Sequence, residues 1–276
     1  MDIKLIAIDI DGTLVNSKKE LTAGVKATIE KAKAQGIKVV ICTGRPLPGA
    51  LKLLAELGLD NDDNQYVVSF GGAVVQSTSG KVIYHQGLTY EDFVDLEAIA
   101  RKMNLHFQVI SPDRIYTCNK DIGYYTLYEA NLVSMGISYR TPDELKDVPL
   151  IKGMFIDEPE ILDPAIADRT YFGQLEDRLE FTKTAAFYYE AYTKGVSKGN
   201  AVAKLCEELG LTAENVMAIG DEENDISMIE FAGIGVAMEN AVPAVKEAAN
   251  EITVDNDHDG VAKVIEKFAL KSDKKR

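Results

Sequence analysis

Residues 5–14, Leu5-Ile6-Ala7-Ile8-Asp9-Ile10-Asp11-Gly12-Thr13-Leu14, carry the strongest structural signal in this chain. An apolar run ends in two aspartates, and residues two apart in a strand lie on the same face. The helical spacing of Val25, Ile29 and Ala32 follows, which predicts a buried strand and then a helix. Two carboxylates this close repel each other in a dry site, which favours a bound cation. An ordinary Asp-Gly turn is the structural alternative.

The same alternation of strand and helix continues on both sides of a long middle section. Apolar strands are predicted at 38–42 and 65–70, with a helix at 48–57 between them. After Lys194 an amphipathic helix precedes a strand at 216–220, and a helix, a strand and two helices follow. Alternating β and α elements predict an α/β fold with a doubly wound parallel sheet, which is a Rossmann-like core domain.

The middle section has a different pattern. A β-hairpin is predicted at 73–84, followed by a helix at 91–103 and strands at 106–110, 114–118 and 150–156. Eleven of the twelve tyrosines fall between Tyr84 and Tyr192, and such a shift in composition indicates a separate unit. We therefore expect a catalytic core formed by 1–82 and 193–276, with an α+β cap domain inserted at 83–192.

Composition limits the partners and the compartment. The 276 residues carry a formal net charge of −14, which disfavours nucleic acid because phosphate backbones attract basic surfaces. The sequence has neither a basic signal-peptide start nor the roughly 18 uninterrupted apolar residues of a membrane helix. Its three cysteines form no CxxC pair. We expect a cytoplasmic monomer or homodimer that binds neither nucleic acid nor membrane.

Three further polar motifs stand at predicted strand ends or helix starts. Thr43-Gly44-Arg45 combines a hydroxyl, a bare glycine amide and a helix start, which suits a phosphate but also an ordinary turn. Lys198 stands immediately before an amphipathic helix, although most lysines are merely solvated. Residues 220–225, Gly-Asp-Glu-Glu-Asn-Asp, supply the oxygen ligands that Mg²⁺ prefers, or an acidic helix cap.

The four motifs in this order resemble the haloacid dehalogenase superfamily, and within it the Cof-type phosphatases with a large cap after the third core strand. The resemblance spans nearly the whole chain, from Asp9-Ile10-Asp11-Gly12-Thr13-Leu14 to the late Asp259-Gly260-Val261-Ala262. Relatives usually have Asn-Gly-Ala after the third strand, whereas this chain has Gly71-Gly72-Ala73. An asparagine contact near the cap hinge is therefore expected to be missing.

The resemblance also implies the roles of individual residues. Asp9 would be the nucleophile and Asp11 the general acid/base, with Thr43 and Lys198 as phosphate ligands. Mg²⁺ would be held by Asp9, Asp221 and the backbone carbonyl of Asp11. The remaining implied contributions are backbone amides from Ile10 and Gly44, a side-chain amide from Asn224, and support of the metal ligands by Asp225.

The function expected from these features is Mg²⁺-dependent hydrolysis of small phosphorylated metabolites, foremost sugar phosphates. A carboxylate nucleophile would form an aspartyl-phosphate, which divides a difficult displacement into two easier ones. A neighbouring carboxylate would first give a proton to the leaving alcohol and then take one from water. Two alternatives remain open: a phosphomutase that uses the same intermediate, and a phosphate-ester sensor without catalysis.

Overall fold

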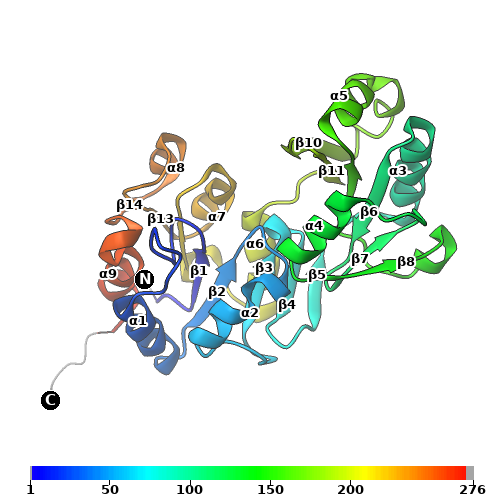
Figure 1. The fold of residues 1–276 in the computed structure, drawn as a ribbon. Coiled ribbons are helices and arrows are strands. Elements are labelled where there is room, and N and C mark those ends of the chain that lie inside the picture. The colour runs from blue at the N-terminus through cyan, green and yellow to red at the C-terminus, as the bar shows by residue number, and fades with distance from the viewer. Residues whose placement is uncertain (1, 272–276) are drawn as a thin grey trace, which may run out of the picture. The chain divides into compact units, whose positions relative to one another are not determined.

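The computed structural model describes residues 2–271, and the chain within them forms two compact units (Figure 1). Unit 1 consists of residues 2–44, 50–84 and 197–271, and unit 2 of residues 45–49 and 85–196. Each unit has its own β-sheet. No helix in the described part of the chain is long and apolar enough to cross a membrane.

Unit 1 is built on an eight-stranded sheet in the order β14-β13-β12-β1-β2-β3-β4-β5. The strands are β1 (Leu5–Asp9), β2 (Lys38–Cys42), β3 (Tyr66–Ser69), β4 (Val74–Ser77), β5 (Val82–His85), β12 (Val216–Gly220), β13 (Ile234–Ala237) and β14 (Glu251–Ile252). The six strands from β14 to β3 are parallel, and β4 pairs with β3 in the antiparallel direction. The strands β1, β2 and β12 at the centre of the sheet are almost wholly buried, as expected of a sheet covered on both faces.

The helices of unit 1 cover both faces of this sheet. They are α1 (Ala23–Ala34), α2 (Leu47–Glu56), α6 (Lys198–Leu209), α7 (Ile226–Phe231), α8 (Pro243–Ala248) and α9 (Gly260–Phe268), and the first three residues of α2 group with unit 2. From β1 the chain moves to β2 in one direction, and from β12 it moves to β13 in the other. Right-handed crossovers in opposite directions place α1 and α7 on opposite faces. In agreement, α1 packs with α9 and α6 packs with α7. The predicted doubly wound α/β fold is confirmed.

Unit 2 has a six-stranded sheet in the order β10-β11-β9-β6-β7-β8. The strands are β6 (His106–Ile110), β7 (Arg114–Thr117), β8 (Gly136–Tyr139), β9 (Lys152–Ile156), β10 (Leu179–Ala185) and β11 (Tyr188–Thr193), and the helices are α3 (Tyr90–Met103), α4 (Tyr124–Leu132) and α5 (Pro159–Ala167). Its pairings are antiparallel except that of β7 with β8. Mainly antiparallel pairing makes this an α+β unit.

An aromatic core holds unit 2 together. Phe93 on α3 stacks on Phe107 of β6, and Phe107 in turn contacts Phe155 of β9. Phe155 also packs against Phe172 and Tyr189, and all five rings are buried. The tyrosines of this section therefore differ in role: Tyr189 belongs to the core, whereas Tyr124 is 70% exposed.

Candidate functional site

The predicted site residues of unit 1 meet at the carboxyl edge of its parallel sheet. In the strand register Asp9 at the end of β1 lies opposite Cys42 at the end of β2, so Thr43 follows at the same edge. On the other side β1 pairs with β12, whose last residue precedes Asp221. Because the chain leaves β1 and β12 in opposite directions, this edge is the topological switch point where open α/β sheets bind ligands.

Lys198 joins this edge from the first turn of α6. The hydroxyl of Ser197 accepts a hydrogen bond from the amide of Asn200 at 3.1 Å, which caps the helix and fixes where it begins. The Lys198 side chain is fully buried, and its ammonium lies 2.6 Å from Asp9 and 2.6 Å from Asp225. A third contact, 3.4 Å long, joins it to the Oδ1 of Asn224. The ammonium is thus directed into the acidic cluster and away from water.

The cluster contains three buried carboxylates with different hydrogen-bond environments. Oxygens of Asp9, Asp221 and Asp225 lie within 4.8 Å of one another. Asp225 has both oxygens engaged, because Oδ1 bonds to Lys198 and Oδ2 accepts the amides of Asp221 and Glu222 at 3.0 and 3.1 Å. Asp221 accepts a 2.7 Å bond from the Thr13 hydroxyl through Oδ1, while Asn240 lies 3.5 Å from its Oδ2.

Burial and mutual repulsion shift the pKa values of these groups. Burial raises the pKa of Asp9 to about 7, with the charge of Asp225 adding to the effect and Lys198 opposing it. Burial likewise raises the pKa of Asp221 to about 6, against the hydrogen bond from Thr13. Burial lowers the pKa of Lys198, but Asp9 and Asp225 outweigh it and leave the pKa above its ordinary value. The site is therefore electrostatically incomplete, with more buried negative than positive charge.

A hard cation would balance the charge of this acidic cluster. Three carboxylates face one ammonium, and oxygen ligands of this kind suit Mg²⁺ or a similar ion. Because Asp225 is saturated by Lys198 and two amides, Asp9 and Asp221 have the oxygens that could bind a metal. The donor set on this edge thus fits a divalent cation.

The other predicted site residues fall into two groups. Ile10 is buried directly after β1 and Thr43 directly after β2, while Gly44 and Asn224 are exposed at the same edge. The carboxylate of Asp11 is not in the cluster: it is 43% exposed and forms a 2.8 Å ion pair with Lys19. The structure therefore brings Asp9, Asp221, Asp225, Lys198 and Asn224 together and leaves the side chain of Asp11 at the surface.

Three contacts at this site have no counterpart in the sequence analysis. Thr13 bonds Asp221, Lys19 bonds Asp11, and Asn240 donates to the carbonyl oxygen of Gly12 at 2.8 Å. Thr13 lies inside the first motif, and a hydroxyl so close to two aspartates could have been predicted to bond a carboxylate of the site. Asn240 follows β13. Because parallel strands end at one edge of a sheet, its position after that strand could have placed it near the site. Lys19 lies in a surface turn with no distinguishing pattern.

Comparisons with known proteins agree with this geometry. The profile of the haloacid dehalogenase-like hydrolase family matches residues 6–265. A Streptococcus pyogenes protein named as a candidate phosphatase is 43% identical over 272 residues, covering 98% of this chain and all of the relative. The 5-amino-6-(5-phospho-D-ribitylamino)uracil phosphatase YcsE of Bacillus subtilis is 31% identical, covering 98% of this chain and 97% of its own. The solved structure of a subclass IIB sugar phosphatase superposes with a TM-score of 0.69 at 25% identity, covering 96% of this chain and 98% of that one.

Proposed function

The chain belongs to the haloacid dehalogenase-like hydrolase family and is a phosphatase, and we propose that it hydrolyses small phosphorylated metabolites with Mg²⁺ and an aspartyl-phosphate intermediate. The observation that carries this proposal is the buried cluster in which Lys198 lies 2.6 Å from both Asp9 and Asp225, with Asp221 alongside. Such a cluster is costly to bury unless a cation offsets its excess negative charge. Mg²⁺ meets that requirement and would in turn attract the phosphate group of a substrate.

Asp9, Asp221 and the backbone carbonyl of Asp11 would hold the Mg²⁺. Asp225 supports this set because it orients Lys198 and accepts the amides of Asp221 and Glu222. When bound, the ion neutralises charge on the phosphoryl oxygens. Thr43 and Lys198, with the amides of Ile10 and Gly44 and the side chain of Asn224, would contact the other phosphoryl oxygens.

Asp9 and Asp11 carry the two chemical steps. A carboxylate oxygen of Asp9 forms a bond to phosphorus while the bond from phosphorus to the ester oxygen breaks, and Asp11 gives its proton to the leaving alcohol. Asp11 then takes a proton from water as that water attacks the aspartyl-phosphate, which releases phosphate and restores Asp9. In the structure Asp11 pairs with Lys19 outside the cluster, so its carboxylate must turn from Lys19 toward the leaving group in this reaction.

We assign the chemistry to the catalytic core, residues 1–82 and 193–276, and the choice of substrate to the cap, residues 83–192. The acids and the lysine all come from unit 1, while most of the exposed aromatic side chains, such as Tyr124 and Tyr128, come from unit 2. Sugar phosphates are the favoured class, because one relative acts on a phosphorylated ribityl compound and a structural neighbour is a sugar phosphatase. The three free, buried cysteines suit the reducing cytoplasm, and we propose a monomer or homodimer there.

Release of inorganic phosphate tests the proposal. Pentose, hexose and ribityl phosphates would be assayed with Mg²⁺ and with a chelator, using wild type, Asp9→Asn and the matched surface variant Asp60→Asn. We expect metal-dependent release on a few of these esters, loss of nearly all turnover in Asp9→Asn, and wild-type rates in Asp60→Asn. Thermal unfolding verifies that each variant is folded. More than a few per cent of activity in Asp9→Asn would exclude Asp9 as the nucleophile, and isomerised product without free phosphate would indicate a mutase.

A further inference from the structure

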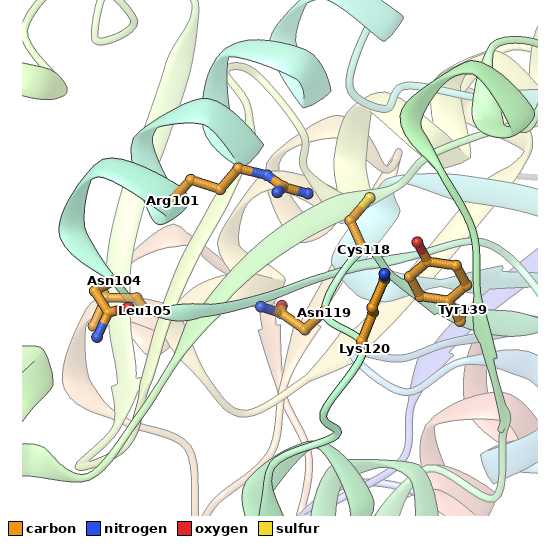
Figure 2. Close-up of a pocket in the computed structure, with 7 residues that line it drawn as sticks. All are labelled: Arg101, Asn104, Leu105, Cys118, Asn119, Lys120 and Tyr139. Carbon is orange, nitrogen blue, oxygen red and sulfur yellow. The ribbon is translucent and has the colours of Figure 1, made fainter.

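Unit 2 contains a pocket that takes no part in the proposed reaction (Figure 2). Its volume is about 460 Å³, within the range of about 300–1,000 Å³ typical of small-molecule sites. The wall comes from the end of α3, the segment after β7 and the end of β8. Its lining includes Arg101, Cys118, Asn119, Lys120 and Tyr139. All belong to unit 2, and none is shared with the cluster around Asp9.

Two cationic groups point into this pocket. Arg101 reaches from α3 toward Cys118, and the ammonium of Lys120 lies on the same side of the space (Figure 2). The Nε of Arg101 bonds both carboxylate oxygens of Glu97 at 2.7 Å, so its position is fixed while its terminal amino groups extend beyond that pair. Lys120 has no ion-pair partner among residues 2–271. The terminal amino groups of Arg101 and the ammonium of Lys120 can therefore donate to the same anionic group.

Lys120 differs from the ion-paired cations of this unit. Lys152 pairs with Glu190, Arg178 with Asp92 and Asp95, and Lys183 with Asp163. A chain with a net charge of −14 offers many carboxylates, yet none belongs to the pocket wall. Glu97 offsets the charge of Arg101, so Lys120 is the cation of this wall that no ion pair among residues 2–271 matches, and its charge attracts anions.

The remaining wall suits the body of an organic ligand. Asn119 accepts the amide of Phe107 at 2.9 Å through its oxygen, which leaves its amide nitrogen as a donor. Tyr139 is 42% exposed, and its ring offers an aromatic surface for a planar or sugar-like group. Burial raises the pKa of the Cys118 thiol to about 11, so the thiol stays protonated and adds no negative charge. With neither a carboxylate nor a thiolate, the pocket can bind a ligand but not attack it.

We propose that this pocket binds a small organic anion, whose phosphate or carboxylate group lies between Arg101 and Lys120 and whose body contacts Asn119 and Tyr139. It is a second ligand site, formed within unit 2 alone, and the bound molecule is not hydrolysed there. The proposal does not depend on the phosphatase reaction, because it uses no residue assigned to that reaction.

Residue-resolved titration tests this proposal. The full chain is labelled with ¹⁵N and carries Asp9→Asn, which prevents turnover of a phosphate ester. Two probes separate the possible ligand groups: adenosine monophosphate carries a phosphate and a ring, and succinate carries carboxylates. We expect saturable shifts at the backbone amides of Asn119, Lys120 and Tyr139, and the tighter of the two probes identifies the preferred anion.

Two lysine variants make the test specific. Lys120→Gln removes a charge from the pocket. We expect the dissociation constant of the preferred probe to rise about tenfold in this variant, because a charge-assisted hydrogen bond is lost. Lys102→Gln is the control: it removes a lysine charge from α3, next to Arg101, where the Lys102 side chain lies over the ring of Tyr171 and outside the pocket wall. The dissociation constant of the probe for this variant should match that for the parent. Equal binding of the probe by the parent and both lysine variants would overturn the proposal. Amide shifts confined to Thr43 and Lys198, or no saturation at millimolar probe concentration, would overturn it as well.

Discussion

Gly72→Ala tests how closely the turn before β4 must pack against the start of α6. Gly72 has a φ of +110°, and an added Cβ would lie 2.1 Å from the carbonyl oxygen of Ser197 and 2.8 Å from the nitrogen of Lys198. Ordinary van der Waals contacts of a Cβ atom begin at 3.4 Å. Both neighbours are backbone atoms, so no side chain can swing aside, and the turn or the first residue of α6 must move by about 1 Å.

Two costs add in this variant. An alanine held at such a φ costs about 1–3 kcal/mol, and the overlap with Ser197 costs about another 1–3 kcal/mol. We therefore expect a loss of about 2–6 kcal/mol, a large part of a typical stability of about 5–15 kcal/mol. The shift also displaces Lys198, whose ammonium lies 2.6 Å from Asp9. A misplacement of about 1 Å should reduce turnover on the order of a hundredfold.

Gly71→Ala is the matched control. Gly71 has a φ of +66°, but an added Cβ would meet nothing within 4 Å. Only the backbone cost of about 1–2 kcal/mol should appear. Denaturant unfolding gives the stability of both variants, and phosphate release gives their rates. If Gly72→Ala loses no more stability than Gly71→Ala and keeps its rate, close packing of Gly72 on Ser197 does not position Lys198.

Three further changes have expected outcomes. Thr13→Val removes the buried 2.7 Å bond to Asp221 and should cost about 1.5–3 kcal/mol in denaturant unfolding; no loss would mean that water replaces the hydroxyl. Burial alone would raise the pKa of Asp92, but hydrogen bonds from Arg178 and Thr89 outweigh it and lower that pKa. Arg178→Gln should therefore cost about 1 kcal/mol at neutral pH, and its deficit should shrink as Asp92 is protonated below about pH 4, when unfolding is measured across that range. Gly71→Asn should change the free energy of unfolding by less than about 1 kcal/mol, because asparagine tolerates a φ of +66° and the space is open; a larger loss would show that the side chain meets an obstacle.

The sequence predicted the parallel sheet well because its strands are short, apolar and bounded by clear turns. The strand expected at 38–42 is observed as β2, and the one expected at 216–220 as β12. Much of unit 2 escaped prediction, including α4. That helix buries Thr126, Glu129 and Ala130 while Tyr124 and Leu132 are 70% and 66% exposed. Its polar and apolar faces are thus reversed relative to an ordinary surface helix, and periodicity of apolar residues cannot reveal it.

The site was predictable only as a set of residues. Each motif ends a strand or opens a helix, and parallel strands bring those ends to one edge. The pairing of Lys198 with Asp225 was not predictable, because the side-chain contact depends on where α6 begins relative to β12. The pocket in unit 2 left no local pattern either, since it joins segments near 101, 119 and 139. The catalytic roles of these residues stay predictions until the variants are assayed.

The geometry of Lys198 constrains how a phosphate could bind. An ammonium has three donors, and those of Lys198 face Asp9, Asp225 and Asn224. In the proposed reaction a phosphoryl oxygen must therefore replace one of these contacts. The two carboxylates lie at 2.6 Å and carry charge, whereas the Asn224 oxygen is neutral and 3.4 Å away. Exchange at Asn224 costs least. It also releases the Asn224 side chain, whose Nδ2 can then donate to the same phosphate. Lys198 thus keeps its ion pairs with Asp9 and Asp225 both before and after the substrate enters.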